Sequence, residues 1–382
     1  MNIVIFSESC FPVINGVSAS TGILSEGLRR LGHKVTVVAP RHKAAGKEEG
    51  VVRTSSFVSG FAKDYPIPSP SCFREADGII GSLAPDIVHV QIPFVYGVAA
   101  RRAARRRGIP FVSVSHTLYP EYVHYVPFLP RRICSAAVKK YMARFYDSCD
   151  AVAVPSEMMK RELEGYGVKK ALKVIPTGID LPREAPSARL RETLGIPAGA
   201  EVLVYMSRVA KEKNLDMLMD AFRLAAEGRP ELFLLITGGG PYLETLKRSA
   251  AASPFSRRIV FTGMVQKNRI YDYLGCGDVF VFPSVTETQG LAVCEAQAAG
   301  LPVVAVRAGG VPENIDENVT GLLTENDKNA FAAAVLRLLE NRELREKMGA
   351  EAAKKAAGFS VGAMLKKYEA FYAFAAGGKN ER

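Results

Sequence analysis

Two glutamates eight residues apart, Glu287 and Glu295, lie in a stretch whose residue types could bind a phosphorylated sugar. The apolar run Val279–Phe282 precedes them and is typical of a buried parallel strand, and helical spacing begins at Gly290. Glu287 is therefore expected in a loop at the carboxyl end of a strand, and Glu295 about one and a half turns into the next helix. Because both carboxylates can face the same crevice, one could bind sugar hydroxyls and the other a ribose.

The loop between the two glutamates would supply backbone amides to an anion. Its last four residues form the expected helix N-terminus, where unpaired N–H groups and the helix dipole attract a phosphate; they are Thr288, Gln289, Gly290 and Leu291. The alternative is a surface loop, with Glu295 on a solvated helix face. The apolar neighbours Cys294 and Ala296 argue against this alternative.

Two cations, Arg208 and Lys213, follow another expected strand, Glu201–Met206. They lie at its carboxyl edge, just before a helix that begins near Asn214. A guanidinium and an ammonium held at such an edge suit a diphosphate. Surface ion pairing with a neighbour such as Glu212 is the alternative.

The first half of the chain offers a glycine and a histidine at comparable places. Gly16 lies between the strand Asn2–Phe6 and a helix expected from about Ser20, where a missing side chain would let backbone approach a phosphate. His116 follows the strand Pro110–Ser115 and is expected to face the crevice at the carboxyl edge of the sheet. A hydrogen-bonded structural histidine is the alternative.

These residues require strands and helices that alternate along the chain, and the sequence provides them. Such alternation predicts an α/β protein with doubly wound parallel sheets. A length of 382 residues suggests two domains, each with its own core. Pro176 and Gly178 indicate the connection. We expect domains over 1–177 and 178–360, and a last helical segment, 361–382, that packs back towards the first domain.

Charge is unevenly placed along the chain. Residues 1–177 carry 24 Lys and Arg against 14 Asp and Glu, whereas residues 178–382 carry 26 against 25. A basic half implies an anionic partner such as nucleic acid or anionic lipid, or else only a solvated basic surface.

The six cysteines show no C-x-x-C pair, which indicates reduced thiols in a cytoplasmic protein without a metal site. Neither a signal peptide nor an apolar run of bilayer-spanning length is found.

An aromatic and prolyl segment, 118–130, leads into a basic helix expected over Ile133–Asp147. Aromatic and basic residues at helical spacing suit a membrane surface, and a helix with one buried and one solvated face fits the spacing equally well. The candidate acceptor-binding or membrane-binding residues are Tyr119, Tyr122, His124, Tyr125, Arg131, Arg132, Lys139 and Lys140. A second basic cluster covers residues 101–107.

Taken together, the loop at Gly16, the Ser115-His116-Thr117 sequence, the Arg208 and Lys213 pair, and the glutamates at 287 and 295 resemble the retaining glycosyltransferases of the GT-B fold. The resemblance extends over essentially the whole chain. It implies two Rossmann-like domains facing a central cleft, with the nucleotide-sugar donor bound by the second domain and the acceptor received by the first.

The resemblance also implies roles for single residues. Arg208 and Lys213 would bind the donor diphosphate, and Glu295 the ribose. The backbone of Val265 would contact the base. Glu287 and the amides after it would hold the sugar, and His116 would touch its hydroxymethyl end.

A closer resemblance is to bacterial diacylglycerol glucosyltransferases, in the phrases at 116–125, 174–179 and 286–291. It implies transfer of glucose from UDP-glucose to a lipid such as diacylglycerol, by a protein held peripherally at the inner face of the cell membrane. The chain contains no D-x-D, so no metal cofactor is expected at the diphosphate. Retention would come from same-face attack within an ion pair, with the leaving phosphate taking the acceptor's proton, or from Glu287 as a nucleophile.

Three other functions remain open at this stage. The first is a GDP-mannose-dependent mannosyltransferase acting on phosphatidylinositol or a polysaccharide. The second is a non-catalytic sugar-binding protein built on similar halves. The third, nucleic-acid binding, rests only on the basic first half, and because no helix-turn-helix, zinc or RNA-binding signature is found we expect no nucleic-acid partner.

Overall fold

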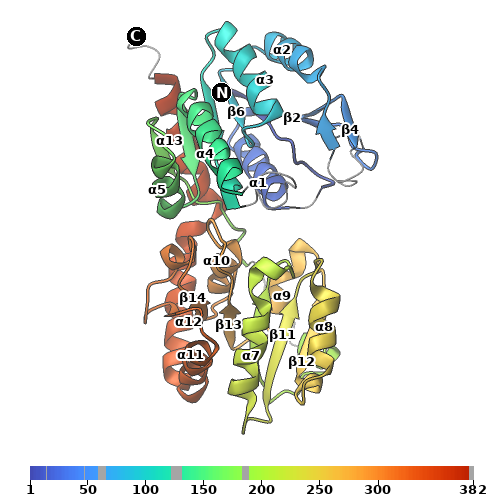
Figure 1. The fold of residues 1–382 in the computed structure, drawn as a ribbon, viewed down its shortest axis with the longest axis vertical. Helices are drawn as coiled ribbons and strands as arrows, with labels where there is room; N and C mark the ends of the chain where they lie inside the picture. The colour runs from blue at the N-terminus through green and yellow to red at the C-terminus, as the bar shows by residue number, and fades with distance from the viewer. Residues whose placement is uncertain (14, 47, 59–65, 122–130, 183–188, 378–382) are drawn as a thin grey trace. The chain divides into compact units, whose positions relative to one another are not determined.

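The computed structural model describes residues 1–382 except 14, 47, 59–65, 122–130, 183–188 and 378–382, and at Arg131 only the backbone. The chain forms two compact units (Figure 1). Unit 1 comprises Met1–Gly178 together with Val361–Arg382, and unit 2 comprises Ile179–Ser360.

Unit 1 is built on a seven-stranded sheet in the order β3-β2-β1-β6-β7-β8-β9, and every neighbouring pair is parallel. Its strands are β1 (Asn2–Phe6), β2 (Lys34–Pro40), β3 (Val51–Thr54), β6 (Ile87–Val90), β7 (Phe111–Val114), β8 (Ala151–Val154) and β9 (Leu172–Val174). A separate antiparallel pair joins β4 (Ser56–Val58) to β5 (Pro66–Pro68). The expected doubly wound parallel sheet is therefore confirmed, and β3 adds an edge strand that the sequence patterns did not indicate.

Helices cover both faces of this sheet because alternate strand residues point to opposite sides. Val4 and Phe6 pack with α2 (Cys72–Leu83), α3 (Val95–Arg106), α4 (Arg131–Asp147) and α5 (Glu157–Gly165). Ile3 and Ile5 pack with α1 (Gly16–Arg30) and α13 (Val361–Gly377). Helix α1 begins at Gly16 rather than near Ser20, so Gly16 belongs to the first helical turn and not to a loop.

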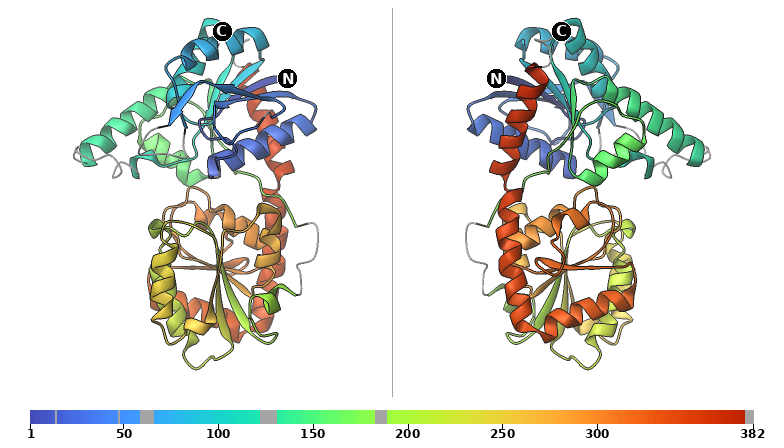
Figure 2. Two further views of the ribbon diagram at one scale, coloured as in Figure 1. Left: turned by 90° about the vertical axis from the view of Figure 1, so that its right-hand side faces the viewer. Right: turned by 90° about the vertical axis from the view of Figure 1, so that its left-hand side faces the viewer.

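The C-terminal helix α13 completes the second face of the unit 1 sheet. Tyr368, Phe371 and Tyr372 on this helix are buried in the same cluster as Ile5. The helix contacts α1 and β8, and both views in Figure 2 show it, in dark red, alongside the strands of this unit. The last helix of the chain is thus part of the core of unit 1.

Unit 2 has a six-stranded sheet in the order β12-β11-β10-β13-β14-β15, again with every pair parallel. Its strands are β10 (Glu201–Met206), β11 (Leu232–Thr237), β12 (Ile259–Gly263), β13 (Val279–Phe282), β14 (Val303–Val306) and β15 (Gly321–Thr324). Its α-helices are α6 (Leu190–Thr193), α7 (Leu215–Ala226), α8 (Leu243–Ala251), α9 (Ile270–Leu274), α10 (Leu291–Ala298), α11 (Lys328–Glu340) and α12 (Arg342–Ala356). Residues of β10, β11 and β13 are almost entirely inaccessible, as expected for a sheet covered on both faces.

The strand order identifies one switch point in each sheet. In unit 1 the chain moves outward from β1 in one direction and from β6 in the other, and in unit 2 β10 and β13 do the same. Loops that leave two such strands at their carboxyl ends diverge and leave a crevice, where ligands of open α/β sheets bind. The loops after β10 and β13 in unit 2, and after β1 and β6 in unit 1, are therefore the candidate ligand-binding loops.

Candidate functional site

The switch point of unit 2 brings together two of the residues singled out in the sequence. The Lys213 ammonium lies 2.5 Å from Oε1 of Glu287, so a cation from the β10 loop meets a carboxylate from the β13 loop. Their side chains are 15% and 17% exposed. Both charges are therefore compensated, yet both are open to a ligand that enters from the crevice.

The local backbone explains how Lys213 reaches this position. It ends a short 3₁₀ turn, Lys211–Lys213, and Asn214 follows in a left-handed conformation with φ 59°. The side-chain amide of Asn214 donates to the carbonyl of Pro283 at 3.1 Å. Asparagine tolerates this conformation better than most residues, so one residue both turns the chain and ties the β10 loop to the β13 loop.

The Glu287 backbone is held by the loop after β14. The N–H of Gly310 donates to the carbonyl of Glu287 at 2.8 Å. Gly309 has a positive φ of 57°, and a Cβ there would lie 2.4 Å from the same carbonyl oxygen. Only glycine fits so close an approach, which means that the Ala308–Gly310 sequence positions the candidate sugar-binding carboxylate.

Arg208 lies nearer to solvent than Lys213. Its side chain is 65% exposed and its guanidinium lies 3.9 Å from the Glu212 carboxylate, which is a weak surface pair. The backbone around it is fixed more firmly, because Tyr205 donates through its hydroxyl to the Arg208 carbonyl at 3.1 Å. The structure thus anchors the loop and leaves the guanidinium free to turn towards an anion.

Val265, the candidate base contact, lies beside the same loop. The N–H of Gly238 donates to the Gly263 carbonyl at 2.9 Å, and a Cβ on Gly238 would lie 1.9 Å from the Ser207 carbonyl oxygen. The loops after β10, β11 and β12 therefore lie side by side at one edge. Met264, next to Val265, is 73% exposed, which makes it an apolar surface of the kind that a flat base could cover.

The start of α10 lies where the sequence predicted an anion site. Gly290 is its N-cap in a left-handed conformation, and none of the described side chains caps the helix. Gln289 is buried, and Asn314 donates through its side chain to the Gln289 carbonyl. Thr288 and Leu291 are partly exposed. The helix N-terminus is thus built from backbone that neighbouring residues hold in place.

Glu295 has different neighbours from Glu287. Burial raises the pKa of Glu295 to about 7, while Lys267 acts in the opposite direction and Asp180 adds a smaller upward shift. Lys267 and Asp180 form an ion pair of 3.0 Å, and the Tyr271 hydroxyl donates to the Asp180 carbonyl. A carboxyl group that is about half protonated at pH 7 can gain substantially from ligand hydroxyls that stabilise its ionised form.

In unit 1, His116 follows β7 and is bonded inside the fold. Its Nε2 lies 2.7 Å from Oε1 of Gln91, the residue directly after β6. Burial lowers the pKa of His116 to about 4, so the imidazole is neutral near pH 7. The structure therefore places a neutral, oriented histidine at the carboxyl edge of this sheet.

The loop between β1 and α1 is also fixed by side chains. Asn15 and Ser18 form a capping box, in which the Ser18 N–H donates to Oδ1 of Asn15 at 2.9 Å. Nδ2 of Asn15 donates to Ser9 Oγ at 2.6 Å. A Cβ on Gly16 would meet no atom within 4 Å, so packing among the described residues does not require glycine at this position.

Glu8, which the sequence reasoning did not select, lies in the same loop. It accepts a hydrogen bond of 3.0 Å from the N–H of Tyr96 at the start of α3. Burial raises the pKa of Glu8 to about 7, against the opposing effect of hydrogen bonds from the Tyr96 and Val95 backbone. Its place two residues after the strand β1 was a signal that could have found it, because His116 was found at the same offset from β7.

Part of the candidate acceptor and membrane region can be described. Tyr119 packs its ring edge-on to Phe94, with the ring centroids 4.9 Å apart. Tyr122, His124 and Tyr125 lie outside the described residues, as does the side chain of Arg131.

Helix α4 has the two faces that an amphipathic pattern predicts. Met142, Phe145 and Tyr146 are buried. Arg132 and Lys140 are exposed, and so is Ile133, at 62%. Lys139 is exposed too, but its ammonium lies 5.0 Å from the centre of the Tyr166 ring. Lys139 is thus partly engaged within unit 1, whereas Arg132, Ile133 and Lys140 form a basic and apolar surface.

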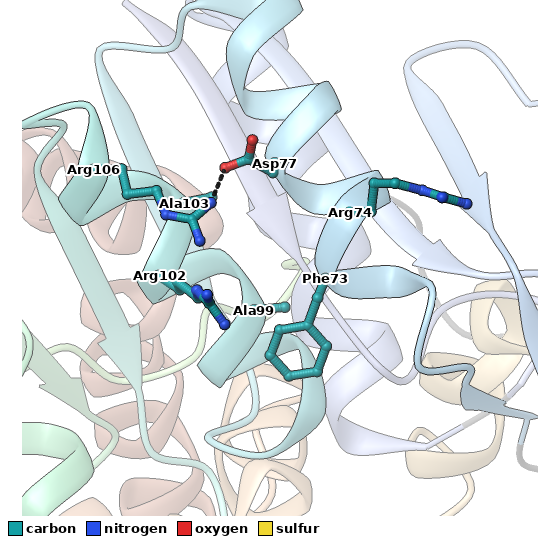
Figure 3. A pocket seen from close by; sticks show the side chains of 7 residues that line it. All are labelled: Phe73, Arg74, Asp77, Ala99, Arg102, Ala103 and Arg106. Atoms are coloured by element: carbon teal, nitrogen blue, oxygen red, sulfur yellow. Dashed lines mark hydrogen bonds and ion pairs between the residues drawn. The ribbon is translucent and has the colours of Figure 1, made fainter.

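The arginine cluster 101–107 does not form a uniform basic patch. Arg101 and Arg105 bond Ser148, and Asp77 pairs with Arg106 at 3.2 Å and with Arg107 at 2.8 Å. A hollow of about 290 Å³ between α2 and α3 is shown in Figure 3, and its lining residues are Phe73, Arg74, Asp77, Ala99, Arg102, Ala103 and Arg106. Most of the cluster therefore stabilises the packing of α2, α3 and α4.

Comparison with known families covers both units. Residues 14–183 match the model described as Glycosyltransferase Family 4, and residues 187–355 match that of Glycosyl transferases group 1. The chain is 31% identical to an alpha-monoglucosyldiacylglycerol synthase from Streptococcus pneumoniae, over 91% of this chain and 80% of the relative. It is 30% identical to a GDP-mannose-dependent alpha-mannosyltransferase from Corynebacterium glutamicum, over 85% of this chain and 77% of the relative.

Solved structures of similar architecture cover nearly the whole chain. Anabaena Alr3699/HepE in complex with UDP superposes with a TM-score of 0.79 at 20% identity, covering 97% of this chain and 99% of that one. Sucrose-phosphate synthase from Thermosynechococcus elongatus superposes with a TM-score of 0.78 at 21% identity, covering 97% and 98%. At this level of identity the likeness concerns the fold.

Proposed function

Because the chain belongs to the group 1 and family 4 glycosyltransferases and has their GT-B fold, we propose that it transfers a hexose, glucose in the first instance, from a nucleotide sugar to a lipid acceptor such as diacylglycerol. Alpha-monoglucosyldiacylglycerol synthases of Streptococcus pneumoniae and Acholeplasma laidlawii, at 31% and 29% identity, support this acceptor. The mannosyltransferases among the relatives support GDP-mannose as the second candidate donor.

The observation that carries the proposal is the ion pair between Lys213 and Glu287 at the switch point of unit 2. In the free protein each charge compensates the other. When a nucleotide sugar binds, its diphosphate takes over Lys213, and Glu287 is released to accept hydrogen bonds from the sugar hydroxyls. Charged hydrogen bonds of this kind contribute about 1.5–3 kcal/mol each.

The departure of the nucleoside diphosphate needs positive groups that are already in place. Lys213, the flexible Arg208 guanidinium and the amides at the start of α10 would stabilise the charge that grows on the leaving phosphate. We propose that this set replaces a metal ion, and that activity therefore persists in excess chelator. Retention at the anomeric carbon would follow from attack on the face that the diphosphate leaves, with the phosphate accepting the acceptor's proton.

The rest of the donor has matching surroundings. Glu295 would bind the ribose hydroxyls, and the backbone of Val265, beside the exposed Met264, would contact the base. In unit 1, His116 would bind a hydroxyl of the transferred sugar, and the backbone at Gly16 would leave space for a ligand group. Glu295, Val265 and His116 would then each have the role that the resemblance to GT-B glycosyltransferases implies for it.

A screen of nucleotide sugars tests the donor. UDP-glucose, UDP, GDP-mannose, free glucose and free mannose are compared for protection of the full chain against thermal unfolding. At a concentration 100 times the Kd, a bound donor stabilises by about 2.7 kcal/mol, so the correct base raises the melting temperature. Protection by GDP-mannose and not by UDP-glucose would favour the mannosyltransferase, and protection by free sugars alone would favour a sugar-binding protein.

The acceptor requires the protein to meet a lipid surface, and α4 supplies one candidate contact. Among the described residues no helix is long and apolar enough to cross a bilayer. We propose peripheral binding through the exposed Arg132, Ile133 and Lys140, because each basic residue near an anionic membrane contributes on the order of 1 kcal/mol.

Co-sedimentation with vesicles of anionic phospholipid tests this contact. Replacing Arg132 and Lys140 by glutamine should weaken binding by more than about tenfold at low salt, and high salt should weaken the wild type in the same way. The matched control replaces Lys366 and Lys367, two exposed lysines of α13. If both double variants bind as tightly as the wild type, α4 is not the membrane contact.

A further inference from the structure

A line of polar side chains runs through unit 1 from His116 to the C-terminal helix. His116 Nε2 lies 2.7 Å from Gln91 Oε1, Gln91 Nε2 lies 3.5 Å from His89 Nε2, and His89 Nδ1 lies 2.8 Å from the hydroxyl of Tyr372. Three of these residues, Gln91, His89 and Tyr372, are at most 1% exposed. The buried side chains of Gln91, His89 and Tyr372 thus form a path of polar contacts that ends at His116.

The fold explains why these residues meet. His89 and Gln91 are two positions apart, on β6 and directly after it, so their side chains leave the strand on the same side. That side is the one covered by α13, where Tyr372 faces the sheet. The rings of His89 and Tyr372 also pack edge-on, with centroids 5.8 Å apart. A residue near the C-terminus is therefore in contact with a strand from the first third of the chain.

The hydrogen bonds along this line have one direction. Gln91 accepts from His116 through its carbonyl oxygen, so His116 carries its proton on Nε2. The Gln91 amide nitrogen can only donate, so His89 Nε2 accepts and the His89 proton is on Nδ1, directed at the Tyr372 oxygen. Burial lowers the pKa of His89 to about 3 and the pKa of His116 to about 4. Near pH 7 each ring therefore carries a proton on only one of its two nitrogens.

We propose that Gln91, His89 and Tyr372 are positioning residues that fix the tautomer of His116, with the proton on Nε2 and the lone pair on Nδ1. A tautomer is set by the hydrogen bond made at the other ring nitrogen. With the proton on Nε2, His116 presents a hydrogen-bond acceptor at Nδ1 and not a donor. The proposal rests on the proposed function for its effect on catalysis, whereas the tautomer itself can be measured without any activity.

Long-range ¹H–¹⁵N spectra of the histidine rings test the proposal directly. The chain has five histidines, so the His116 signals can be assigned by comparison with a His116→Asn variant. In the wild type we expect a pyrrole-type nitrogen at Nε2 and a pyridine-type nitrogen at Nδ1 of His116. A predominant Nδ1–H tautomer in the wild type would overturn the proposal.

Tyr372→Phe tests whether the effect starts in α13. Without the hydroxyl the Nδ1 proton of His89 loses its acceptor, so His89 should move its proton to Nε2, Gln91 should turn its amide over, and His116 should shift towards Nδ1–H. The matched control is Tyr368→Phe, which removes a buried hydroxyl one helical turn earlier and leaves the His89–Tyr372 bond in place. An unchanged His116 tautomer in a folded Tyr372→Phe variant would overturn the role of α13.

Two substitutions of Gln91 separate positioning from simple packing. Gln91→Leu removes the acceptor and should lower kcat about 3- to 10-fold, the equivalent of one hydrogen bond, with donor affinity changed less. Gln91→Glu keeps an acceptor for His116 and should restore the Nε2–H tautomer. If Gln91→Leu keeps that tautomer, the proposal fails. If the wild type shows the tautomer but transfers no hexose, the proposed function fails and the positioning role stands.

Discussion

The carboxyl edges of the two sheets are built from different chemistry. In unit 2 the switch point carries partly exposed charges, with Lys213 against Glu287 and Arg208 near Glu212. In unit 1 the corresponding edge carries buried neutral groups, with His116 bonded to Gln91. A partly exposed ion pair can exchange its partner at low cost, whereas a buried neutral network holds one geometry.

This difference matches two kinds of ligand. A nucleotide sugar carries two negative phosphate charges and calls for cations that can be released from a carboxylate. A hydroxyl group, on a sugar or a lipid, calls for oriented neutral acceptors and donors. The contrast therefore agrees with a charged donor bound by unit 2 and hydroxyl groups bound by unit 1, and each prediction below tests one side of it.

The largest effect is expected from the cations of unit 2. Lys213→Ala should lower kcat about 10²- to 10³-fold, because the charge on the leaving diphosphate grows in the transition state. The loss of stability should be about 1–3 kcal/mol, because Glu287 loses its partner while keeping some contact with solvent. Steady-state kinetics and thermal unfolding measure the two effects separately. Lys211→Ala, at an exposed lysine of the same 3₁₀ turn, is the control and should retain activity; equal losses in both variants would remove Lys213 from the site.

The next effect concerns Glu295, a carboxyl group of the unit 2 site whose pKa is raised to about 7. Ribose hydroxyls should bind its ionised form, so Glu295→Gln should weaken UDP-glucose binding about 10- to 100-fold at pH 8.

Wild-type affinity should also fall about tenfold between pH 8 and pH 6, as the carboxylate takes up its proton. Calorimetry at both values provides the measurement, and Glu227→Gln, at an exposed carboxylate of the same unit, is the control. Affinity that is independent of pH in the wild type would contradict this role.

A smaller effect is expected from Glu8, whose pKa in unit 1 is raised to about 7 from an ordinary 4.5. The folded protein holds this proton more tightly than the unfolded chain, so the stabilisation is complete below about pH 4.5 and is lost as pH rises through 7. Glu8→Gln keeps an acceptor for the Tyr96 N–H without the buried charge. It should be about 1–3 kcal/mol more stable than the wild type at pH 8 and unchanged near pH 4.

Thermal unfolding at the two pH values measures this difference. Glu26→Gln, at an exposed carboxylate of α1, should show no such dependence. A Glu8→Gln variant that is less stable at pH 8 would show that the edge of unit 1 needs the charge, and would weaken the contrast between the units.

The sequence predicted where the candidate residues of unit 2 lie in the fold, because they stand at fixed offsets from strands that are themselves easy to recognise. Glu287, Lys213 and Val265 each follow an apolar run, and the parallel order of the strands brings those runs to one edge. The partners of these residues were not predictable. Gly309 supports Glu287 from a loop 22 residues later, and only the close approach of two backbones explains why it is glycine.

Net charge was a poor guide to the position of the chemistry. The excess of positive charge lies in residues 1–177, yet His116 and Gln91 at the edge of unit 1 are neutral, and Asp77 and Ser148 engage most of the arginines at 101–107. Composition counts charges without their partners. The link from His116 to Tyr372 could not be inferred either, since it depends on how the last helix packs on β6.

The most direct test of the account is transfer of radiolabelled glucose from UDP-glucose to vesicles that contain diacylglycerol and anionic phospholipid. The full chain should give an organic-soluble labelled product in the presence of EDTA, and Lys213→Ala should give at least about 10²-fold less. The product should show an α-anomeric proton by NMR. If UDP-glucose gives no labelled lipid in the presence or absence of metal ions, while GDP-mannose labels a phosphoinositide or a polysaccharide, the proposed donor and acceptor are both wrong.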